Sequence, residues 1–123
     1  MKKLKDSEYA KMDADIRATV RWLRSNGFET MTSRGKPHKM DCECLPAVGI
    51  FVHPREVLAE ADRLYHLLNK RSPQFFDRKL EAKDNPMFID IVATYVPEES
   101  IGAIDIYGPG LIEGWKNHLK AVH

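Results

Sequence analysis

Apolar residues recur near the start of the chain with the period of a helix. Ile16, Val20 and Leu23 are spaced i, i+4 and i+7, so they lie on one face of a helix predicted over residues 13–25. Gly27 is expected to end this helix, because glycine adopts the left-handed conformation of a helix cap at little cost.

Two further helices are predicted, one in the middle and one at the end of the chain. Pro54 stands at the start of the first, where proline is tolerated, and Pro73 stands beyond its end. The apolar stripe of this helix consists of Val57, Ala61, Leu64 and Leu68. The terminal helix follows the chain break at residues 108–110 and is marked by Leu111, Ile112, Trp115 and Leu119.

The strands are predicted from alternating or continuous apolar runs. Ala47–Val52 is apolar on both faces, which is typical of a central strand. Met87–Tyr95 and Ile101–Tyr107 are joined by a loop that contains Pro97, so they are expected to form a hairpin. With Glu29–Thr32 as a short further strand, the chain is predicted to be an α+β two-layer sandwich, a mainly antiparallel sheet of about four strands with three helices on one face.

The length and the segment types limit the domain organisation. The chain has 123 residues, enough for one domain with one core. Residues 1–12 are mostly polar and are expected to fray or to pair only in an oligomer, whereas residues 13–123 form the α+β domain. No run approaches the roughly 20 apolar residues of a membrane span, and no apolar run follows the basic start as in a signal peptide. Cys42 and Cys44 are too close for a useful disulfide, which favours reduced thiols and a cytoplasmic location.

The charge balance argues against nucleic acid as the partner. The chain has 19 Lys and Arg residues against 18 Asp and Glu residues, a formal net charge of +1, so it has no global field to attract DNA or RNA. Arg17, Arg21 and Arg24 form a cationic stripe on the first helix, which is typical of a solvated face with Asp13 as a pairing partner. No helix-turn-helix, RNP or zinc-finger pattern is present in the sequence. Any anion site must therefore come from local clustering.

Such a cluster lies in the loop between the first two strands. Arginine and lysine supply charge-assisted hydrogen bonds to phosphate, glycine lets backbone N–H groups approach a ligand, and serine adds a hydroxyl. The spacing differs from that of a P-loop, and the alternative is an ordinary solvated connection. The loop is predicted to bind an anionic ligand through Ser33, Arg34, Gly35, Lys36, His38 and Lys39.

The hairpin offers a second candidate surface. Tyr95 is a candidate for stacking on a ligand ring, although tyrosines also commonly form the rim of a half-buried strand. Because strand side chains alternate, Asp90, Val92 and Thr94 share one face, and we expect Asp90 and Asp105 to point to solvent. This polar face would suit a partner protein.

Metal binding and catalysis have weaker support. His38, Cys42, Cys44 and His53 contain the ligand types of a zinc site, but Cys-x-Cys is a poor chelate and a strand separates His53 from the rest. No metal or cofactor is therefore predicted. Nothing in the sequence fixes a thiolate beside a base, so no catalytic residue is predicted and the protein is expected to be non-enzymatic.

One part of the chain carries a family resemblance. In Asp13–Thr32 a helix ends in Gly-Phe-x-Thr and leads into Ser33-x-Gly35, and Val57–Leu68 contains the run Glu-Ala-Asp-Arg-Leu. This pattern resembles small uncharacterised proteins of phages and prophages. The resemblance implies a role in host takeover or anti-defence, in which small proteins often bind a nucleotide signal or a host protein without catalysis.

Three functions are compatible with these observations. The first is a homodimeric, non-catalytic protein of the host cytoplasm that binds a small phosphorylated, nucleotide-like ligand with the Ser33–Lys39 loop. The second is an inhibitor that caps a host enzyme through a sheet edge or through the face near Asp90 and Asp105. The third is a small hydrolase or phosphodiesterase using His38 or His53, which requires two facing histidines or a bound metal.

Overall fold

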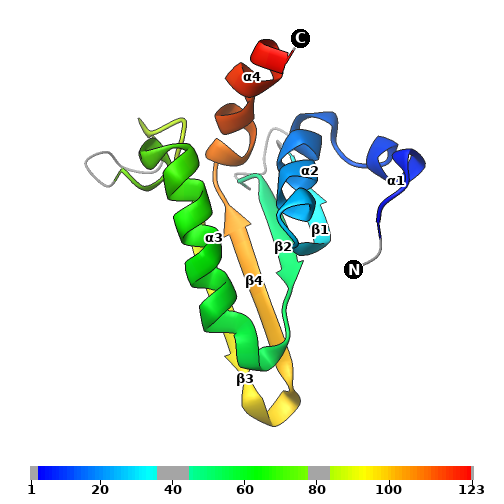
Figure 1. The fold of residues 1–123 in the computed structure, drawn as a ribbon, viewed down its shortest axis with the longest axis vertical. Coiled ribbons are helices and arrows are strands. Elements are labelled where there is room, and N and C mark those ends of the chain that lie inside the picture. Colours follow the sequence, from blue (N-terminus) through cyan, green and yellow to red (C-terminus); the bar gives the residue numbers. More distant parts are fainter. Residues whose placement is uncertain (1–2, 36–44, 78–83, 123) are drawn as a thin grey trace.

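The protein folds around one four-stranded antiparallel sheet with the strand order β1-β2-β4-β3 (Figure 1). The computed structural model describes residues 3–35, 45–77 and 84–122, with side chains described up to residue 116. The strands are β1 (Glu29–Arg34), β2 (Ala47–Phe51), β3 (Asp90–Val96) and β4 (Ile101–Tyr107). The predicted α+β class with a mainly antiparallel sheet is confirmed, and β2 is one of the two central strands.

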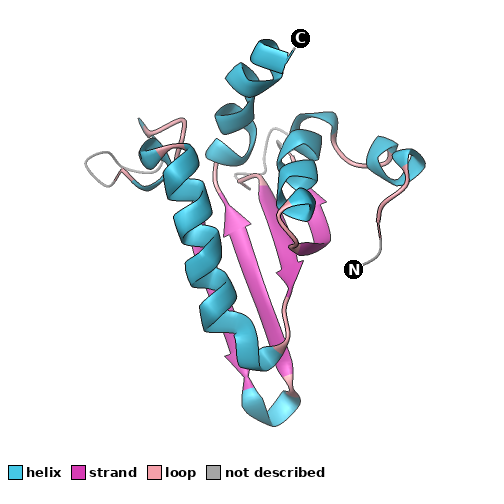
Figure 2. Ribbon diagram, viewed as in Figure 1, coloured by secondary structure: helices cyan, strands magenta, loops and turns pink. Residues whose placement is uncertain are grey.

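Two helices, α2 (Arg17–Ser25) and α3 (Val57–Arg71), lie over one face of this sheet, which makes the fold a two-layer sandwich (Figures 1 and 2). The α-helices are α1 (Asp6–Ala10), α2 (Arg17–Ser25), α3 (Val57–Arg71) and α4 (Gly110–Val122). Short 3-10 turns, η1 (Ala14–Ile16), η2 (Pro54–Glu56), η3 (Pro73–Phe76) and η5 (Pro97–Glu99), extend or connect them. Helix α2 packs over β1, and α3 packs over β3 and β4. Among the described residues, no helix combines the length and the hydropathy needed to span a bilayer.

The core lies between the helices and the sheet. The predicted stripes of α2 and α3 supply buried side chains, and every second residue of β2 and β4 meets them. Burial of this apolar surface is the main force that holds the two layers together. The largest fully buried side chains are Trp115, Phe28, Phe75, Ile16, Leu23, Ile50, Leu64, Leu68, Ile89, Ile104, Ile106 and Leu111.

The end of α2 sets the path into the sheet. Gly27 has a φ of +86°, and its N–H donates to the Arg24 carbonyl at 3.1 Å, while the Phe28 N–H donates to the Leu23 carbonyl at 3.0 Å. These two bonds form the Schellman cap expected at this glycine. The chain then turns directly into β1, with Phe28 buried beneath the helices.

The N-terminal segment is more ordered, and the arginines of α2 make more contacts, than the sequence predicted. Residues 6–10, which we expected to fray, form α1, and Tyr9 is buried beneath the guanidinium of Arg21 at 3.9 Å from the ring centroid. Arg17 donates to the Met12 carbonyl at 3.0 Å, and Arg24 donates to the Thr30 hydroxyl at 2.9 Å. Each arginine of the cationic stripe therefore makes a contact outside α2, while Arg21 remains exposed, as expected of a solvated face.

The burial of β2 differs between its two apolar faces. The apolar run of Ala47–Val52 predicted a central strand, which is confirmed, but only Val48 and Ile50 of β2 contact the helical layer as fully buried apolar side chains. Phe51 is 58% exposed on the opposite side. The described helices cover only one face, so a continuous apolar run here marks a central strand with one apolar face left uncovered.

Candidate functional site

The face of the sheet opposite the helices is called the open face here. Because Val48 and Ile50 point into the core, the alternation of strand side chains places their neighbours on this open face. Strand pairing then arranges the open face in rows across the sheet. One row is Arg34, Ala47, Tyr107 and Asp90; the next is Thr32, Gly49, Asp105 and Val92; the third is Glu29, Phe51, Ala103 and Thr94.

Large apolar side chains collect on the open face. Met31, Phe51, Val92 and Ile101 all lie there, and they are four of the eight large apolar side chains that are exposed in the described part of the chain. Met31 reaches the centre, because its Cε lies 3.6 Å from the position that a Cβ on Gly49 would take. Gathered exposed apolar side chains on one face are typical of interaction surfaces, whereas isolated ones are ordinary.

The charges of the open face are mainly negative. Glu29, Asp90 and Asp105 provide three carboxylates against the one guanidinium of Arg34. Arg34 is also tied to the backbone, since its Nη2 donates to the Leu45 carbonyl at 2.9 Å. Asp105 is exposed near the middle of the face, as the sequence predicted. An apolar surface with an acidic bias suits a cationic or neutral partner better than a phosphate-rich one.

Asp90 is held in a hydrogen-bonded corner instead of pointing freely to solvent. The Tyr107 hydroxyl donates to Asp90 Oδ2 at 2.6 Å, and the Ile91 N–H donates to Asp90 Oδ1 at 2.9 Å. The hydrogen bond to Asp90 raises the pKa of Tyr107, with smaller contributions from desolvation and from the carboxylate charge. This corner fixes one end of β3 against β4.

Removing the Tyr107 hydroxyl is expected to weaken this corner in a pH-dependent way. Tyr107→Phe should lower the free energy of unfolding by about 1 kcal/mol near neutral pH, less than a buried hydrogen bond to a charged group contributes, because solvent screens this partly exposed pair. Because the pKa of Tyr107 is raised by folding, its contribution is complete below the unfolded pKa of about 10 and is lost as the pH rises through the folded pKa. Urea unfolding of both proteins between pH 7 and pH 11 measures the difference. A difference that grows above pH 10 would contradict the assignment.

The structure places only part of the predicted anion-binding loop. Ser33 is half-buried in β1, and Arg34 is bound to the Leu45 carbonyl. The Gly35 N–H donates to Asp13 Oδ2 at 2.9 Å. The Arg34 bond therefore joins the residues that flank the loop, and the Gly35 bond ties its start to the segment before η1. The remaining predicted residues, Lys36, His38 and Lys39, lie outside the described residues, as do Cys42 and Cys44.

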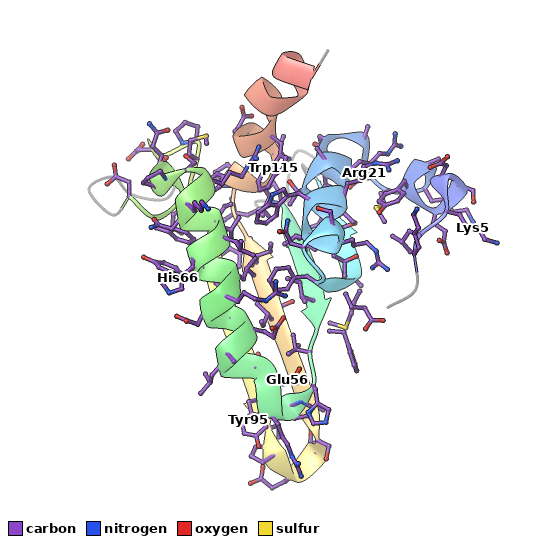
Figure 3. The ribbon with its side chains drawn as sticks, viewed as in Figure 1. Lys5, Arg21, Glu56, His66, Tyr95 and Trp115 are labelled. Atoms are coloured by element: carbon purple, nitrogen blue, oxygen red, sulfur yellow. The ribbon has the colours of Figure 1, made fainter. Side chains whose placement is uncertain are left out.

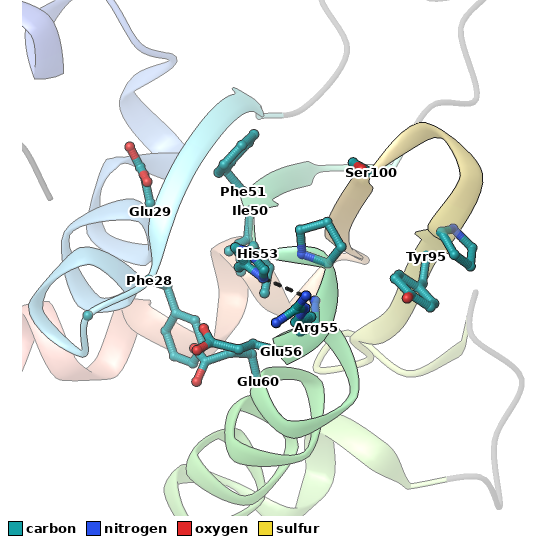
Figure 4. A pocket seen from close by; sticks show the side chains of 14 residues that line it. Phe28, Glu29, Ile50, Phe51, His53, Arg55, Glu56, Glu60, Tyr95 and Ser100 are labelled. Atoms are coloured by element: carbon teal, nitrogen blue, oxygen red, sulfur yellow. Dashed lines mark hydrogen bonds between the residues drawn. The ribbon is translucent and has the colours of Figure 1, made fainter.

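Tyr95 is not brought to that loop. Arg34 pairs with Ala47 at one end of the sheet, whereas Tyr95 pairs with Gly102 at the other end. Figure 3 shows Tyr95 beside Glu56 at the end of the sheet far from Trp115. Tyr95 instead lines an open cleft of about 840 Å³ at the start of α3 (Figure 4). The other side chains around this cleft include Phe28, Glu29, Phe51, His53, Arg55 and Glu60.

The chemistry of this cleft does not resemble a phosphate or hydrolase site. The His53 Nδ1 accepts a hydrogen bond from the Arg55 N–H at 3.2 Å, which caps the start of η2 (Figure 4). Glu60 pairs with Arg63 at 2.8 Å. Three carboxylates in the lining outnumber the one arginine, so the cleft disfavours an anion. Within the described residues, no group of three His, Cys, Asp or Glu side chains could hold a metal.

Sequence reasoning anticipated the polar residues of the open face and missed its apolar ones. The alternation of the strand predicts Val92 on the same face as Asp90, which is confirmed, but it does not predict the exposed apolar side chains of the neighbouring strands beside it. The apolar run marks Phe51 as part of a central strand, but it does not show that this side chain is exposed. The usable signal is the predicted two-layer arrangement, because helices on one face leave the other face of the sheet uncovered.

Comparisons with known proteins add no further assignment. No family model matches the chain, and neither curated proteins nor solved structures match it significantly.

Proposed function

We propose that this protein is a non-catalytic binding module whose open face binds another protein. The observation that supports this function is the cluster of Met31, Phe51, Val92 and Ile101 on a sheet face that no described helix covers. Aromatic and methionine side chains of this kind form the centres of protein interfaces. Asp105, exposed among them, provides a polar contact that orients the partner.

The charge of the open face narrows the kind of partner. A surface that offers apolar side chains with one or two lysines or arginines complements the carboxylates of Glu29 and Asp105. Nucleic acid is a poor fit, because its phosphates would approach carboxylates. Gly49 has no side chain of its own, and the Thr32, Asp105 and Met31 side chains close in over it, so the middle of the face presents a methionine beside a carboxylate to the partner.

This proposal follows the second of the three functions derived from the sequence. In the phage setting that the resemblance implies, the partner would be a host protein and the module an inhibitor of it. Binding of a phosphorylated ligand by the Ser33–Lys39 loop stays a prediction, because three of the named loop residues lie outside the described part.

The test compares matched surface variants in quantitative pull-downs from cells that express the chain. Phe51→Ala removes the most exposed aromatic of the open face, and Asp105→Lys reverses its central charge. Each is expected to reduce recovery of the true partner at least about tenfold, as loss of a central anchor or a like-charge contact does. The control is Glu98→Lys, in the exposed hairpin turn η5, which changes the net charge by the same amount as Asp105→Lys.

Selective loss is the criterion in this experiment. A captured protein supports the proposal only if both open-face variants lose it while Glu98→Lys retains it. Binding measured between the purified partner and each purified variant must give the same order of affinities. A partner retained by both Phe51→Ala and Asp105→Lys would overturn the proposal. Unchanged melting temperatures of the variants show that the fold is intact.

A further inference from the structure

Strand β3 lies at an edge of the sheet, where no other described strand pairs with it. The Val52 N–H donates to the Gly102 carbonyl at 3.3 Å, so the even-numbered residues of β4 bond towards β2 and its odd-numbered residues bond towards β3. In the β3–β4 register, odd-numbered residues of β4 face even-numbered residues of β3. The N–H and C=O groups of Ile91, Ala93 and Tyr95 must therefore point outwards. The bond from the Ile91 N–H to its neighbour's side chain, Asp90 Oδ1, agrees with this parity.

The two edges of the sheet are built differently. At the β1 edge, the register shifts between Thr30 and Thr32, and Arg24 donates to the Thr30 carbonyl at 3.3 Å. A bulge and a charged side chain are the usual devices that stop an edge strand from pairing with another chain. Strand β3 pairs continuously with β4 over seven residues, and it contains no bulge, proline or lysine. Apart from the Asp90 carboxylate, which accepts from the Ile91 N–H, nothing in the described part of the chain blocks the pairing of another strand with the β3 edge.

We propose that a second copy of this chain occupies the β3 edge, with two β3 strands pairing antiparallel about a twofold axis at Ala93. This inference goes beyond the proposed function and does not depend on it. In this register Ala93 faces Ala93 of the other copy, and Ile91 faces Tyr95. The outward N–H and C=O groups of one β3 strand therefore lie opposite the outward groups of the other, as an antiparallel pair requires. Asp90 faces Val96, so no like charges are opposed across the strand pair. The arrangement would join two sheets and two open faces into one continuous surface.

The helical layer supports the same axis. Arg63 donates to the Asn26 carbonyl at 2.8 Å and lies over the Phe28 ring, which places that flank of α3 on the β1 side. With 3.6 residues per turn, Leu58 and Tyr65 lie on the opposite flank, above the β3 edge. Leu58 is 79% exposed and Tyr65 is also exposed, although an apolar flank next to a free edge would normally be covered.

The positions of Leu58 and Tyr65 along the direction of β3 match the proposed twofold axis. A Val57 methyl lies 2.9 Å from the position of a Cβ on Gly102, which pairs with Tyr95, so the start of α3 is level with Tyr95. Ala93 lies two residues along the strand from there, about 6.6 Å, which corresponds to four or five helical residues. The axis therefore passes near residues 61–62 of α3. Leu58 and Tyr65 lie about equally far on either side, so Leu58 of one copy would face Tyr65 of the other.

Paired substitutions on β3 test the register itself. In the proposed dimer Val92 faces Thr94 of the other copy, so Val92→Lys with Thr94→Lys opposes like charges, whereas Val92→Lys with Thr94→Glu opposes unlike charges. Sedimentation velocity from about 1 µM to about 1 mM protein covers the affinities expected of a small interface. The wild type is expected to dimerise, the double-lysine variant to dissociate at least about tenfold more readily, and the lysine–glutamate variant to dimerise like the wild type or better.

A backbone substitution gives an independent measure. Ala93→Pro removes an N–H that points away from β4, so it should abolish the dimer while β3–β4 pairing and the circular dichroism spectrum are preserved. A wild type that stays monomeric throughout the range, or a dimer that survives both Ala93→Pro and the double-lysine change, would overturn the inference. Phe51→Ala and Asp105→Lys lie on β2 and β4 and should leave the dimer unchanged, so loss of partner binding with an intact dimer concerns the proposed function alone.

Discussion

Trp115→Ala is expected to lower the free energy of unfolding by about 3–5 kcal/mol, the usual cost of emptying a buried aromatic site. Trp115 is 2% exposed and stacks on Phe75 with ring centroids 5.7 Å apart. The Trp22 ring meets it edge-on at 5.6 Å, and the Arg71 guanidinium lies 4.6 Å from its centroid. One side chain therefore connects α4, α2, α3 and η3. Alanine would leave a cavity, and closing it would require four separate elements to move at once.

Trp115→Phe is the matched control for this prediction. The Trp115 Nε1 is buried without a hydrogen-bond partner in the described structure, so phenylalanine loses volume but no hydrogen bond. We expect the control to lose less than half as much stability as the alanine variant. Urea unfolding monitored by far-ultraviolet circular dichroism measures both. Losses below about 1 kcal/mol for alanine would show that this cluster does not hold the layers together.

Helical periodicity was the most informative pattern in the sequence. Val20 and Leu23 in α2, and Leu64 and Leu68 in α3, are all fully buried, as their spacing predicted. The hairpin was equally well marked, and β4 runs over the predicted Ile101–Tyr107. In these elements the local pattern and the tertiary burial agree, because each element meets the core on one face only.

The start of β3 shows where local patterns stop being sufficient. The apolar run at Met87 predicted a strand, but β3 begins at Asp90. The Ile89 N–H donates to the Phe75 carbonyl at 3.0 Å, and the Phe88 carbonyl accepts from the Gly110 N–H at 2.9 Å. These partners come from η3 and α4, which are distant in sequence. No pattern within the run could show that its backbone bonds go to them instead of to a neighbouring strand.

The candidate site was predictable in its parts but not as a whole. Phe51, Val92 and Ile101 come from three strands, and they lie close together on one face only because β2, β4 and β3 are neighbours and pair in this register. Strand order depends on long-range pairing that composition does not encode. The basic loop was easier to notice because Ser33–Lys39 is contiguous. Local composition thus favoured a loop site over a surface assembled by the fold.

Gly102→Ala is expected to destabilise the protein by about 3 kcal/mol, near the upper end of the cost of overpacking a core. Gly102 lies on the helical side of β4, and an added Cβ would lie 2.5 Å from the Val52 carbonyl oxygen and 2.9 Å from the Pro54 Cα. Both are backbone atoms, so relief requires η2 to move away from the sheet. The cleft at the start of α3 would be distorted with it.

Gly49→Ala is the matched change on the other face of the same sheet, and it should cost less than about 1 kcal/mol. Its Cβ would lie 3.0 Å from Thr32 Oγ1 and 3.3 Å from Asp105 Oδ1, which are side-chain atoms that can rotate aside. Thermal unfolding of both variants decides between these expectations, and equal losses would contradict them. Because Gly49→Ala keeps the fold while raising a methyl group between Thr32 and Asp105, it should still weaken the partner binding proposed for the open face. Gly102→Ala would then mainly lower stability, whereas Gly49→Ala would mainly lower partner binding.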